Sequence, residues 1–376
     1  MLRDLLMTKD DLSVVMTTDA VGGIWTYSID LGRELVRKGM TVRLAVFGPG
    51  PDVEKQAIAA EAGLGLSMMN LPPEWLAPDA AEVARAGDAL AELCRREKAD
   101  ILHLNQPSLA GQTRFDVPVV AACHSCLATW WEAVKSTPMP DDFRWRTDLV
   151  GRGYRSAQAL VAPSRAFAEA TQRVYGLDRE PSVVHNGRAP DPVAPRTGPP
   201  IEAVFTAGRL WDEGKNAATL DRVAALTTAP FRAAGPTAGP NGTHIDLPHL
   251  ELLGSLSEEA MRHHLSENPV YVSAARYEPF GLAILEAAQA GCALVLSDID
   301  SFRELWDEAA LFVRPDDEEG FAAAVGRLLS DPDLRADYAH AAQNRSRVYG
   351  LDAFADEMTL VYKDLMAGTR DKDHAA

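Results

Sequence analysis

Residues 270–299 of the chain read VYVSAARYEPFGLAILEAAQAGCALVLSDI. The apolar start predicts a buried strand, and the residues after the loop predict a helix that Gly291 ends. A second apolar strand follows the helix, so the segment has the order of a parallel β–α–β unit. Glu278 lies in the loop and Glu286 lies in the first turns of the helix. Both carboxylates therefore border the carboxyl edge of a parallel sheet, where α/β proteins bind ligands.

The same alternation extends along the whole chain. Apolar residues at helical spacing predict a helix at 24–38 and a final amphipathic helix through Phe354, Met358, Val361 and Leu365. Short apolar runs predict strands at 12–18, 41–47, 101–104, 117–123, 159–162, 182–185, 203–207, 270–275 and 293–297. Strands that alternate with helices favour the α/β class, with parallel sheets and helices on both faces.

Two domains are expected, because 376 residues exceed what one hydrophobic core usually serves. Five prolines fall within residues 188–200, and proline cannot extend a strand ladder, so this stretch predicts a linker. A glycine- and proline-rich stretch at 235–248 predicts a surface loop. We expect the final helix to pack back on the first domain, with a disordered tail from Gly368. The expected division is 1–190, 191–350 and 351–376.

The composition excludes several classes of protein. The net charge of −17 argues against a nucleic-acid partner, because such binding depends on Lys and Arg that neutralise phosphates. No apolar run reaches the roughly 20 residues that span a bilayer, and the first residues lack the order of a signal peptide. Four cysteines do not form a disulfide framework in a chain of this length. We expect a cytoplasmic protein; contact with the inner face of a membrane and the oligomeric state stay open.

Gly22 and Gly23 follow the first predicted strand. Paired glycines let a backbone approach a ligand closely, and the helix N-terminus behind them presents free N–H groups to an anion. We therefore place both glycines among the donor-binding residues of the site described below. The alternative is a tight turn that needs only a positive φ. The spacing lacks the G-x-G-x-x-G pattern, so an NAD-binding fingerprint is not supported.

The 270–299 segment resembles the E-x7-E block of the family-4 retaining glycosyltransferases. E-P-F-G-L, then L-E-A and a small-residue turn into a strand, carry the resemblance. It implies two Rossmann-like domains that face across a deep cleft, the GT-B fold. In that family the first Glu lies beside the donor sugar, the second binds the ribose, and the backbone amides between them hold sugar and phosphate. The resemblance implies a catalytic role for Glu278 and donor-binding roles for Glu278, Phe280, Gly281, Leu282 and Glu286.

Residues 207–216 read AGRLWDEGKN and resemble the family's Arg and Lys on the donor pyrophosphate. Two fixed cations stabilise a departing nucleoside diphosphate, so neither a metal ion nor a cofactor is expected. The resemblance implies donor contacts for Gly208, Arg209 and Lys215, and the two cations are also catalytic. Where the family usually has Lys-Gly, this chain has Lys215 followed by Asn216. The alternative interpretation of the segment is a solvated charged turn.

Two further motifs, both in the first half of the chain, also resemble motifs of the family. The H-N-G sequence at 185–187 resembles the family's P-N-G-V segment, which implies that Asn186 lines the cleft and contacts the donor. His124 follows a predicted strand and resembles the family's histidine beside the reacting sugar, which implies a catalytic role. The family often continues with His-Asp, whereas this chain continues with Ser125. A histidine at a strand end is otherwise a structural residue.

Three other patterns are expected to be structural. The D-x-D sequence at 298–300 matches metal-dependent glycosyltransferases, but it lies at a strand end where the family needs no metal. Cys123 and Cys126 match C-x-x-C, but the first closes an apolar strand instead of opening the helix that a redox thiolate requires. Ser164 follows a strand and is expected to cap the next helix.

Trp130, Trp131 and Trp145 mark a segment that we place on the wall of the first half. Aromatic faces stack on sugar rings, so Trp130 and Trp131 are candidate acceptor contacts, but buried tryptophans are also ordinary core residues. A polysaccharide, a lipid-linked glycan and a small molecule all stay open as the hydroxyl acceptor. Uridine and guanosine diphosphate hexoses both stay open as the nucleotide-sugar donor.

These motifs together predict a retaining hexosyltransferase that acts by front-face substitution. The acceptor hydroxyl attacks on the side from which the phosphate leaves. Arg209 and Lys215 stabilise the leaving group, while Glu278 and His124 hold the sugar. One alternative is a nucleotide-sugar epimerase of the same fold, which needs no acceptor. An NAD-dependent oxidoreductase and a binding protein with a decayed site are further alternatives.

Overall fold

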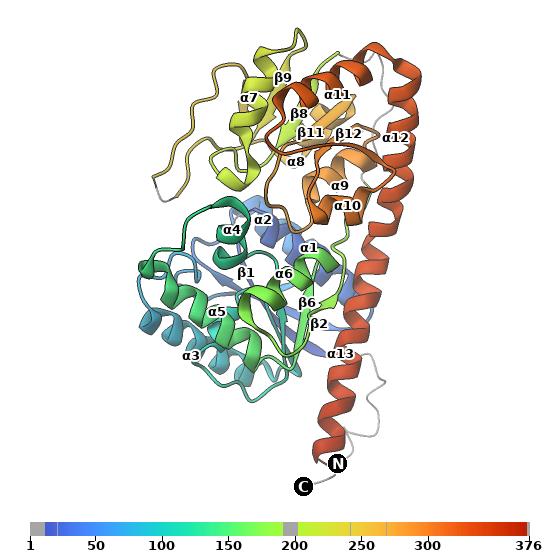
Figure 1. Ribbon diagram of the computed structural model, residues 1–376. Coiled ribbons are helices and arrows are strands. Elements are labelled where there is room, and N and C mark those ends of the chain that lie inside the picture. The colour runs from blue at the N-terminus through green and yellow to red at the C-terminus, as the bar shows by residue number, and fades with distance from the viewer. Residues whose placement is uncertain (1–11, 21, 191–201, 241, 268, 374–376) are drawn as a thin grey trace. The chain divides into compact units, whose positions relative to one another are not determined.

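The computed structural model describes residues 12–20, 22–190, 202–240, 242–267 and 269–373. The chain divides into two compact units, each with one parallel sheet and helices between most of its successive strands (Figure 1). The predicted α/β class with two Rossmann-like domains is therefore confirmed. Unit 1 comprises Met1–Thr129, Thr137–Gly187 and Leu351–Ala376, and unit 2 comprises Trp130–Ser136 and Arg188–Gly350.

The sheet of unit 1 has seven parallel strands in the order β3-β2-β1-β4-β5-β6-β7. In β1, Val14 lies opposite Val42 of β2 on one side and Ile101 of β4 on the other. The strand order reverses at β1, and ligands of such sheets bind where the carboxyl ends of the strands diverge. The strands are β1 (Ser13–Asp19), β2 (Thr41–Phe47), β3 (Gly65–Met68), β4 (Ile101–Leu104), β5 (Val119–Ala122), β6 (Ala159–Ala162) and β7 (Ser182–Val183).

The helices of unit 1 turn apolar faces to this sheet, as Leu31 and Leu35 of the first helix show by their complete burial. Asp52, Asp79 and Ser164 each accept a hydrogen bond from the backbone N–H three residues on. Ser164 is thus a helix N-cap, as predicted. The helices are α1 (Gly23–Arg37), α2 (Val53–Glu61), α3 (Ala80–Glu97), α4 (Leu127–Val134), α5 (Arg144–Ser156), α6 (Arg165–Tyr175) and α13 (Leu351–Asp373), with 3-10 turns η1 (Pro107–Ala110) and η2 (Asp141–Phe143).

Helix α13 joins unit 1 from the far end of the sequence. Its residues Phe354, Met358 and Tyr362 are buried in the same hydrophobic core as Leu31 and Leu35 of α1. Burial of the apolar face stabilises a helix far more than its intrinsic propensity does. The first sheet, α1 and α13 are therefore parts of one core.

Unit 2 contains six parallel strands in the order β10-β9-β8-β11-β12-β13. They are β8 (Val204–Ala207), β9 (Phe231–Ala234), β10 (Glu251–Gly254), β11 (Val270–Ser273), β12 (Ala293–Ser297) and β13 (Ala310–Val313). The helices are α7 (Ala217–Ala225), α8 (Glu258–Glu267), α9 (Leu282–Gln289), α10 (Asp300–Trp306), α11 (Glu318–Ser330) and α12 (Pro332–Ser346), with 3-10 turns η3 (Glu213–Lys215) and η4 (Arg347–Tyr349).

Both faces of the second sheet are covered by apolar side chains. Along β12, Leu294 and Leu296 pack in one hydrophobic cluster with Trp306 of α10. Val295 points to the other face and packs in a second cluster with Val325 of α11. Strands that are buried on both faces have continuous apolar sequences, which explains why the sequence predicts β12 at its observed bounds.

The structure agrees to different extents with the three segments that the sequence predicts to be irregular. Helix α13 continues to Asp373, so the prediction of a disordered tail is wrong for residues 368–373, and 374–376 lie outside the described residues. Of the predicted linker, 188–190 has no regular structure and 191–200 lies outside the described residues. The predicted loop at 235–248 contains an antiparallel bridge between Ala238 and His244.

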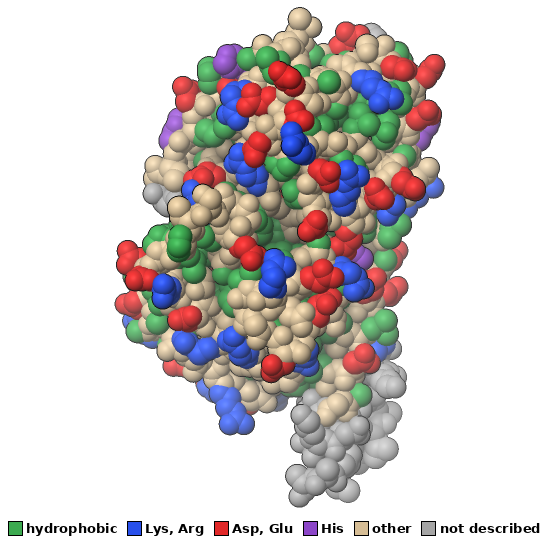
Figure 2. Space-filling model, in the orientation of Figure 1, with side chains coloured by type: hydrophobic (Ala, Val, Ile, Leu, Met, Phe, Trp, Pro, Cys, Tyr) green, Lys and Arg blue, Asp and Glu red, His purple; other side chains and the backbone are tan. Residues whose placement is uncertain are grey.

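Charged side chains of both signs are interspersed on the face shown in Figure 2. Several of them pair, as Arg303 does with Asp298 at 2.6 Å. Within the described part of the chain, no helix combines the length and the apolar character that a bilayer-spanning helix needs.

Candidate active site

The predicted glutamate loop runs from the end of β11 to the start of α9. Gly281 ends it with a φ of 90° and a ψ of 68°, a left-handed conformation that favours glycine. A β-carbon at this position would lie 2.9 Å from Cδ1 of Ile284 and 3.4 Å from Cγ of Glu278. Phe280 is buried, and Leu282 is the first residue of α9. Glycine therefore allows α9 to begin directly beside the Glu278 side chain.

Lys215 and Glu278 form an ion pair. Lys215 ends η3 and directs its Nζ to Oε2 of Glu278. The two side chains are 23% and 17% exposed, so water screens the pair only in part. Gly208 borders the pair, since a β-carbon on Gly208 would lie 3.8 Å from Cδ and Cε of Lys215. The structure thus brings together two residues that the sequence assigns to the donor diphosphate and the donor sugar.

Backbone hydrogen bonds join the two loops that carry this ion pair. The amides of Arg276 and Tyr277, after β11, donate to the carbonyl oxygen of Gly214 at 2.9 and 3.2 Å. The hydroxyl of Ser301, in α10, donates to the carbonyl oxygen of Glu278 at 2.6 Å. The ion pair is therefore held by the carboxyl ends of the neighbouring strands β8 and β11.

Arg209 lies at the start of the same loop after β8, and 56% of its side chain is exposed. Its Nη2 lies 2.8 Å from Oδ2 of Asp212, and its guanidinium carbon lies 5.9 Å from the centre of the Trp211 ring. The buried Asp212 also accepts a hydrogen bond from the Gly214 amide at 2.9 Å. Asp212 thus fixes the loop, while the guanidinium keeps donors exposed to an incoming anion.

Residues 130–136 belong to unit 2, so their predicted place on the wall of the first half is wrong. The indole N–H of Trp130 donates to Oδ1 of Asp212 at 2.9 Å. Nζ of Lys135 lies 5.7 Å from the Trp130 ring centre and 6.0 Å from the Trp131 ring centre, and it pairs with Glu213 at 2.6 Å. These side chains pack on the loop after β8, which is the physical reason for the difference.

Glu286 lies in the second turn of α9 and pairs with Arg188. Nη2 of Arg188 lies 2.9 Å from Oε1 of Glu286, and both side chains are largely buried. The backbone of Arg188 is fixed as well: its N–H donates to Tyr349 at 3.2 Å and its carbonyl accepts from Gln289 at 3.0 Å. The sequence shows Arg188 only as the start of a linker, and no local pattern reveals a partner 98 positions away.

His124 lies just after β5 in unit 1. Its Nε2 lies 2.7 Å from Oδ1 of Asn105, whose Nδ2 donates to the Thr17 carbonyl at 2.7 Å and to Oγ of Ser28 at 3.1 Å. Because both amide hydrogens of Asn105 are used, its oxygen faces His124, and Nε2 of the imidazole carries the proton. Burial lowers the pKa of His124 to about 4, so the imidazole is neutral near pH 7.

His103, which the sequence analysis missed, is a fully buried histidine in the same unit. His103 in β4 lies 3.2 Å from the Tyr27 hydroxyl through Nε2 and 2.8 Å from the Tyr362 hydroxyl through Nδ1. Burial lowers the pKa of His103 to about 3. The edge of the Tyr27 ring meets the His124 ring at a centre distance of 4.4 Å. Within unit 1, the polar contacts of His103 with Tyr362 and Tyr27 and the ring contact of Tyr27 with His124 therefore connect α13 to His124.

The other predicted residues of unit 1 lie near strand or unit ends. Gly22 has a φ of 66°, and Gly23 begins α1. Apart from its chain neighbours, no described residue has an atom within 4 Å of a β-carbon on Gly22, so the backbone conformation favours glycine there. Asn186 is buried near the end of the unit. Asp19, not singled out by the sequence analysis, ends β1 and accepts a hydrogen bond from the Trp75 indole at 3.3 Å. Gly22, Gly23, His124 and Asn186 are thus described within unit 1, and the other predicted donor contacts within unit 2.

Two family models match this arrangement. Residues 21–191 match the model described as Glycosyltransferase Family 4, and residues 246–345 match the model described as Glycosyl transferases group 1. Together the two matches cover most of both units. The chain belongs to the group 1 glycosyltransferases of family 4. The predicted family is therefore confirmed.

Curated relatives of this glycosyltransferase include a glycogen synthase of Mycobacterium tuberculosis. It is 29% identical over 294 residues, which are 69% of this chain and 68% of the relative. A D-inositol 3-phosphate glycosyltransferase of Xylanimonas cellulosilytica is 26% identical over 92% of both chains. A phosphatidyl-myo-inositol mannosyltransferase of Mycolicibacterium smegmatis is 33% identical over 31% of both chains.

Solved structures show that the glycosyltransferase has the GT-B fold. A sucrose-phosphate synthase from Thermosynechococcus elongatus aligns with a TM-score of 0.79 and 17% identity over 95% of this chain and all of that chain. The Anabaena protein HepE, solved with UDP and glucose, aligns with a TM-score of 0.72 and 16% identity over 94% of this chain and all of that chain. Identities this low establish the fold alone.

The D-x-D and C-x-x-C sequences of the glycosyltransferase are found in surroundings that suit structural residues. Asp298 of the D-x-D sequence binds the guanidinium of Arg303 through both oxygens at 2.6 and 2.8 Å, and this hydrogen bonding lowers its pKa. Burial raises the pKa of the Cys123 and Cys126 thiols, which disfavours the thiolate that redox chemistry needs. Within the described residues, no cluster of three or more His, Cys, Asp or Glu side chains could hold a metal ion.

Proposed function

We propose that this glycosyltransferase moves a hexose from a nucleoside diphosphate sugar to a hydroxyl acceptor with retention at the anomeric carbon. The observation that carries the proposal is the Lys215–Glu278 ion pair at the carboxyl ends of β8 and β11. It places a cation for the diphosphate next to a carboxylate for the sugar. Arg209 provides a second, exposed cation on the same loop.

The bound UDP and glucose in the structure of HepE support a nucleotide-sugar donor for this chain as well. In our proposal unit 2 holds the donor and unit 1 holds the acceptor. Glu286 accepts hydrogen bonds from the ribose diol. Arg188, which already pairs with Glu286, holds that carboxylate in place.

The proposed reaction is a front-face substitution. The bond between the anomeric carbon and the phosphate oxygen breaks, and the bond to the acceptor oxygen forms on the same face. The acceptor proton passes to the departing phosphate oxygen, so no strong side-chain base is needed. An ammonium has three N–H donors, so Lys215 can keep Glu278 and also bind the diphosphate as its charge grows. We propose that Lys215 and Arg209 supply this stabilisation without a metal ion or a cofactor.

We assign His124 to the sugar. Its Nε2–H is held by Asn105, so the imidazole offers Nδ1 as an acceptor to a sugar hydroxyl. The four cysteines are free, which supports our placement of the reaction in a reducing compartment, the cytoplasm. Trp130 and Trp131 are weaker candidates for the acceptor than the sequence suggests, because Lys135 covers both rings.

Thermal melting with nucleotides tests the proposal. UDP, GDP, ADP and NAD are each added to the protein in EDTA, and Arg209→Ala is measured beside the wild type. One nucleoside diphosphate should raise the melting temperature, because a ligand at a hundred times its dissociation constant stabilises by about 2.7 kcal/mol. The Arg209→Ala variant should bind it more weakly. Stabilisation by NAD alone, or a nucleotide effect that EDTA removes, contradicts the proposal.

A further inference from the structure

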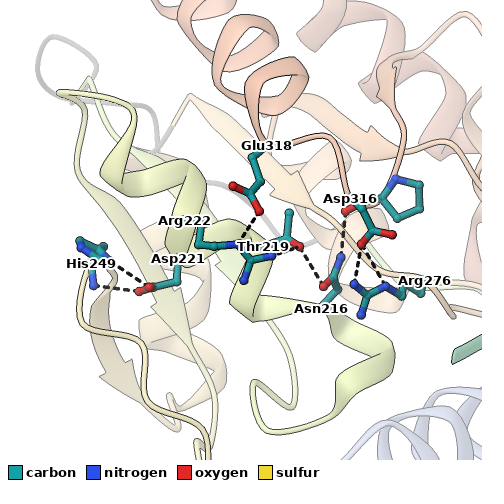
Figure 3. Close-up of polar contacts among 9 residues, drawn as sticks. Asn216, Thr219, Asp221, Arg222, His249, Arg276, Asp316 and Glu318 are labelled. Atoms are coloured by element: carbon teal, nitrogen blue, oxygen red, sulfur yellow. Dashed lines mark hydrogen bonds and ion pairs between the residues drawn. The ribbon is translucent and has the colours of Figure 1, made fainter. Parts of the chain in front are cut away.

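We propose that Asn216 is a positioning residue for Lys215 and that it builds the diphosphate site before the donor binds. The inference rests on the proposed function, since it assigns a task to Lys215. It concerns a residue that touches neither the sugar nor the diphosphate in our proposal. The proposal rests on the hydrogen bonds of the Asn216 side chain; Figure 3 shows its contact with Thr219 and the charged residues around it.

The backbone at Asn216 has a conformation that few residues adopt. Its φ is 55° and its ψ is 37°, and it connects η3 to α7 directly after Lys215. A side chain with a β-carbon is disfavoured in this left-handed region, and asparagine is among the residues that tolerate it best. The direction in which the chain leaves Lys215 therefore depends on this residue.

The side-chain amide of Asn216 is fully used. Nδ2 donates to the carbonyl oxygens of Ala274 and Pro315, at 2.9 Å each. Oδ1 accepts a hydrogen bond from the Thr219 hydroxyl at 3.0 Å. The residue is 3% exposed, so water does not compete for these contacts. Since only the NH2 group can donate to two carbonyls, the amide orientation is unique.

These contacts join three loops at the carboxyl edge of the second sheet. Ala274 follows β11 and leads into the loop that carries Glu278, while Pro315 follows β13. Asn216 belongs to the loop that carries Lys215. The buried Asn216 amide therefore adds a side-chain link to the backbone hydrogen bonds between the two loops whose side chains form the Lys215–Glu278 ion pair.

An outer layer of charged side chains surrounds this amide (Figure 3). Arg222 donates to the Thr219 hydroxyl at 3.1 Å and pairs with Glu318. Arg276 pairs with Asp316 at 2.5 Å. These pairs are more exposed than the amide, so salt screens them and they contribute less to the position of Lys215.

The test replaces Asn216 by glycine. Asn216→Gly keeps the left-handed backbone available and removes all three side-chain hydrogen bonds. We expect kcat to fall by about 10- to 100-fold, with a smaller change in KM, because a catalytic group displaced by about 1 Å costs up to about a hundredfold in rate. Nucleotide release from the donor is measured in EDTA, and melting temperatures confirm that the variant is folded.

The matched control is a residue that contacts α7. His249 lies in a turn before β10, and its Nδ1 lies 2.9 Å from Oδ2 of Asp221 in α7. Its backbone N–H also donates to Oδ1 of Asp221 at 2.8 Å. Figure 3 shows this pair on the other side of Asn216 from Arg276 and Asp316. His249→Ala removes a side-chain contact of α7 without touching the Lys215 loop, so kcat should stay within about twofold of the wild type.

A double-mutant cycle separates positioning from a general structural role. If Asn216 acts through Lys215, Asn216→Gly should have almost no further effect on kcat in a Lys215→Ala background. Full additivity of the two losses, or a wild-type kcat in Asn216→Gly, overturns the inference.

A second measurement does not depend on turnover. An amine-reactive reagent, with peptide mass spectrometry, reports how accessible the Lys215 ammonium is. Labelling of Lys215 should be faster in Asn216→Gly than in the wild type or His249→Ala; equal labelling rates overturn the inference. A wild type whose melting temperature no nucleoside diphosphate raises contradicts the proposed function instead, and the labelling result still decides the role of Asn216.

Discussion

Lys215 and Glu278 form an ion pair, and each neutralises a charge that the other's loop would otherwise carry. Removing one partner of such a half-buried ion pair destabilises the folded protein, because the remaining charge is then left without compensation. The pair therefore links stability and chemistry at one point. Asn105 likewise prepares His124 for its proposed role, because the Asn105 side-chain oxygen determines that Nε2 of the imidazole carries the proton.

Lys215→Ala should lower the rate of nucleotide release at saturating donor by about 100- to 1000-fold, the loss expected when one fixed charge on a departing anion is removed. Arg314→Ala is the matched control, because Arg314 is a cation of the same unit with 84% of its side chain exposed. Release is measured with a coupled assay in EDTA. A Lys215→Ala variant with the wild-type rate would refute the assignment of the site.

His124 should stay neutral through the pH range in which histidine usually titrates. Its pKa is lowered to about 4 by burial, whereas an unperturbed histidine titrates near 6.5, so lowering the pH from 8 to 5 should not charge it. Nitrogen-15 NMR of the ring should show the Nε2–H tautomer across that range. A titration midpoint near 6.5, or a proton on Nδ1, would contradict the structure.

Several elements follow directly from the sequence. The predicted bounds of β2, β4, β6 and β12 equal the observed ones, because these strands are apolar runs between clear turn residues. Three of the missed strands, β3, β10 and β13, are edge strands with one neighbour each. An edge strand buries less of its surface, so its apolar run is short; β10 is mostly exposed. The missed β9 is internal, but Arg232 interrupts its apolar sequence.

The candidate site was only partly readable from the sequence for a related reason. Glu278 and Lys215 lie in recognisable local motifs, so the sequence alone predicts Glu278 as a contact of the donor sugar and Lys215 as a contact of the diphosphate. By contrast, no local pattern marks Arg188, which pairs with Glu286, Asn105, which bonds His124, or Asn216, which bonds the Ala274 carbonyl. Their contacts arise only when distant parts of the chain meet at a sheet edge. The left-handed backbone at Asn216 likewise depends on the fold.

Tyr362→Phe tests the attachment of α13 to unit 1. The change removes the hydroxyl that lies 2.8 Å from Nδ1 of His103 and leaves that buried nitrogen unpaired, which should destabilise the fold by about 1–3 kcal/mol. Leu360→Ala, with 62% of the side chain exposed on the same helix, should cost less than about 0.5 kcal/mol. Melting temperatures compare the two. Equal melting temperatures would show that the Tyr362 contact does not hold α13.

Across the whole molecule, each unit presents its polar side chains where parallel strands end. In unit 1, Asp19 ends β1, and Asn105 and His124 follow β4 and β5. In unit 2, Lys215 and Glu278 follow β8 and β11. The chain shares its fold with a sucrose-phosphate synthase at only 17% sequence identity, so most positions can carry different residues without changing the fold. The specificity of the chain must therefore be sought in the loops at these edges.

The most direct test of retaining, metal-independent transfer is the configuration of the first sugar released. The wild type is incubated in EDTA with the nucleoside diphosphate hexose whose nucleotide raises the melting temperature, and proton NMR follows the anomeric signals before mutarotation. We expect the released hexose to appear first as the same anomer as in the donor. Initial appearance of the opposite anomer, or loss of the reaction in EDTA with recovery on adding a divalent cation, would contradict the account.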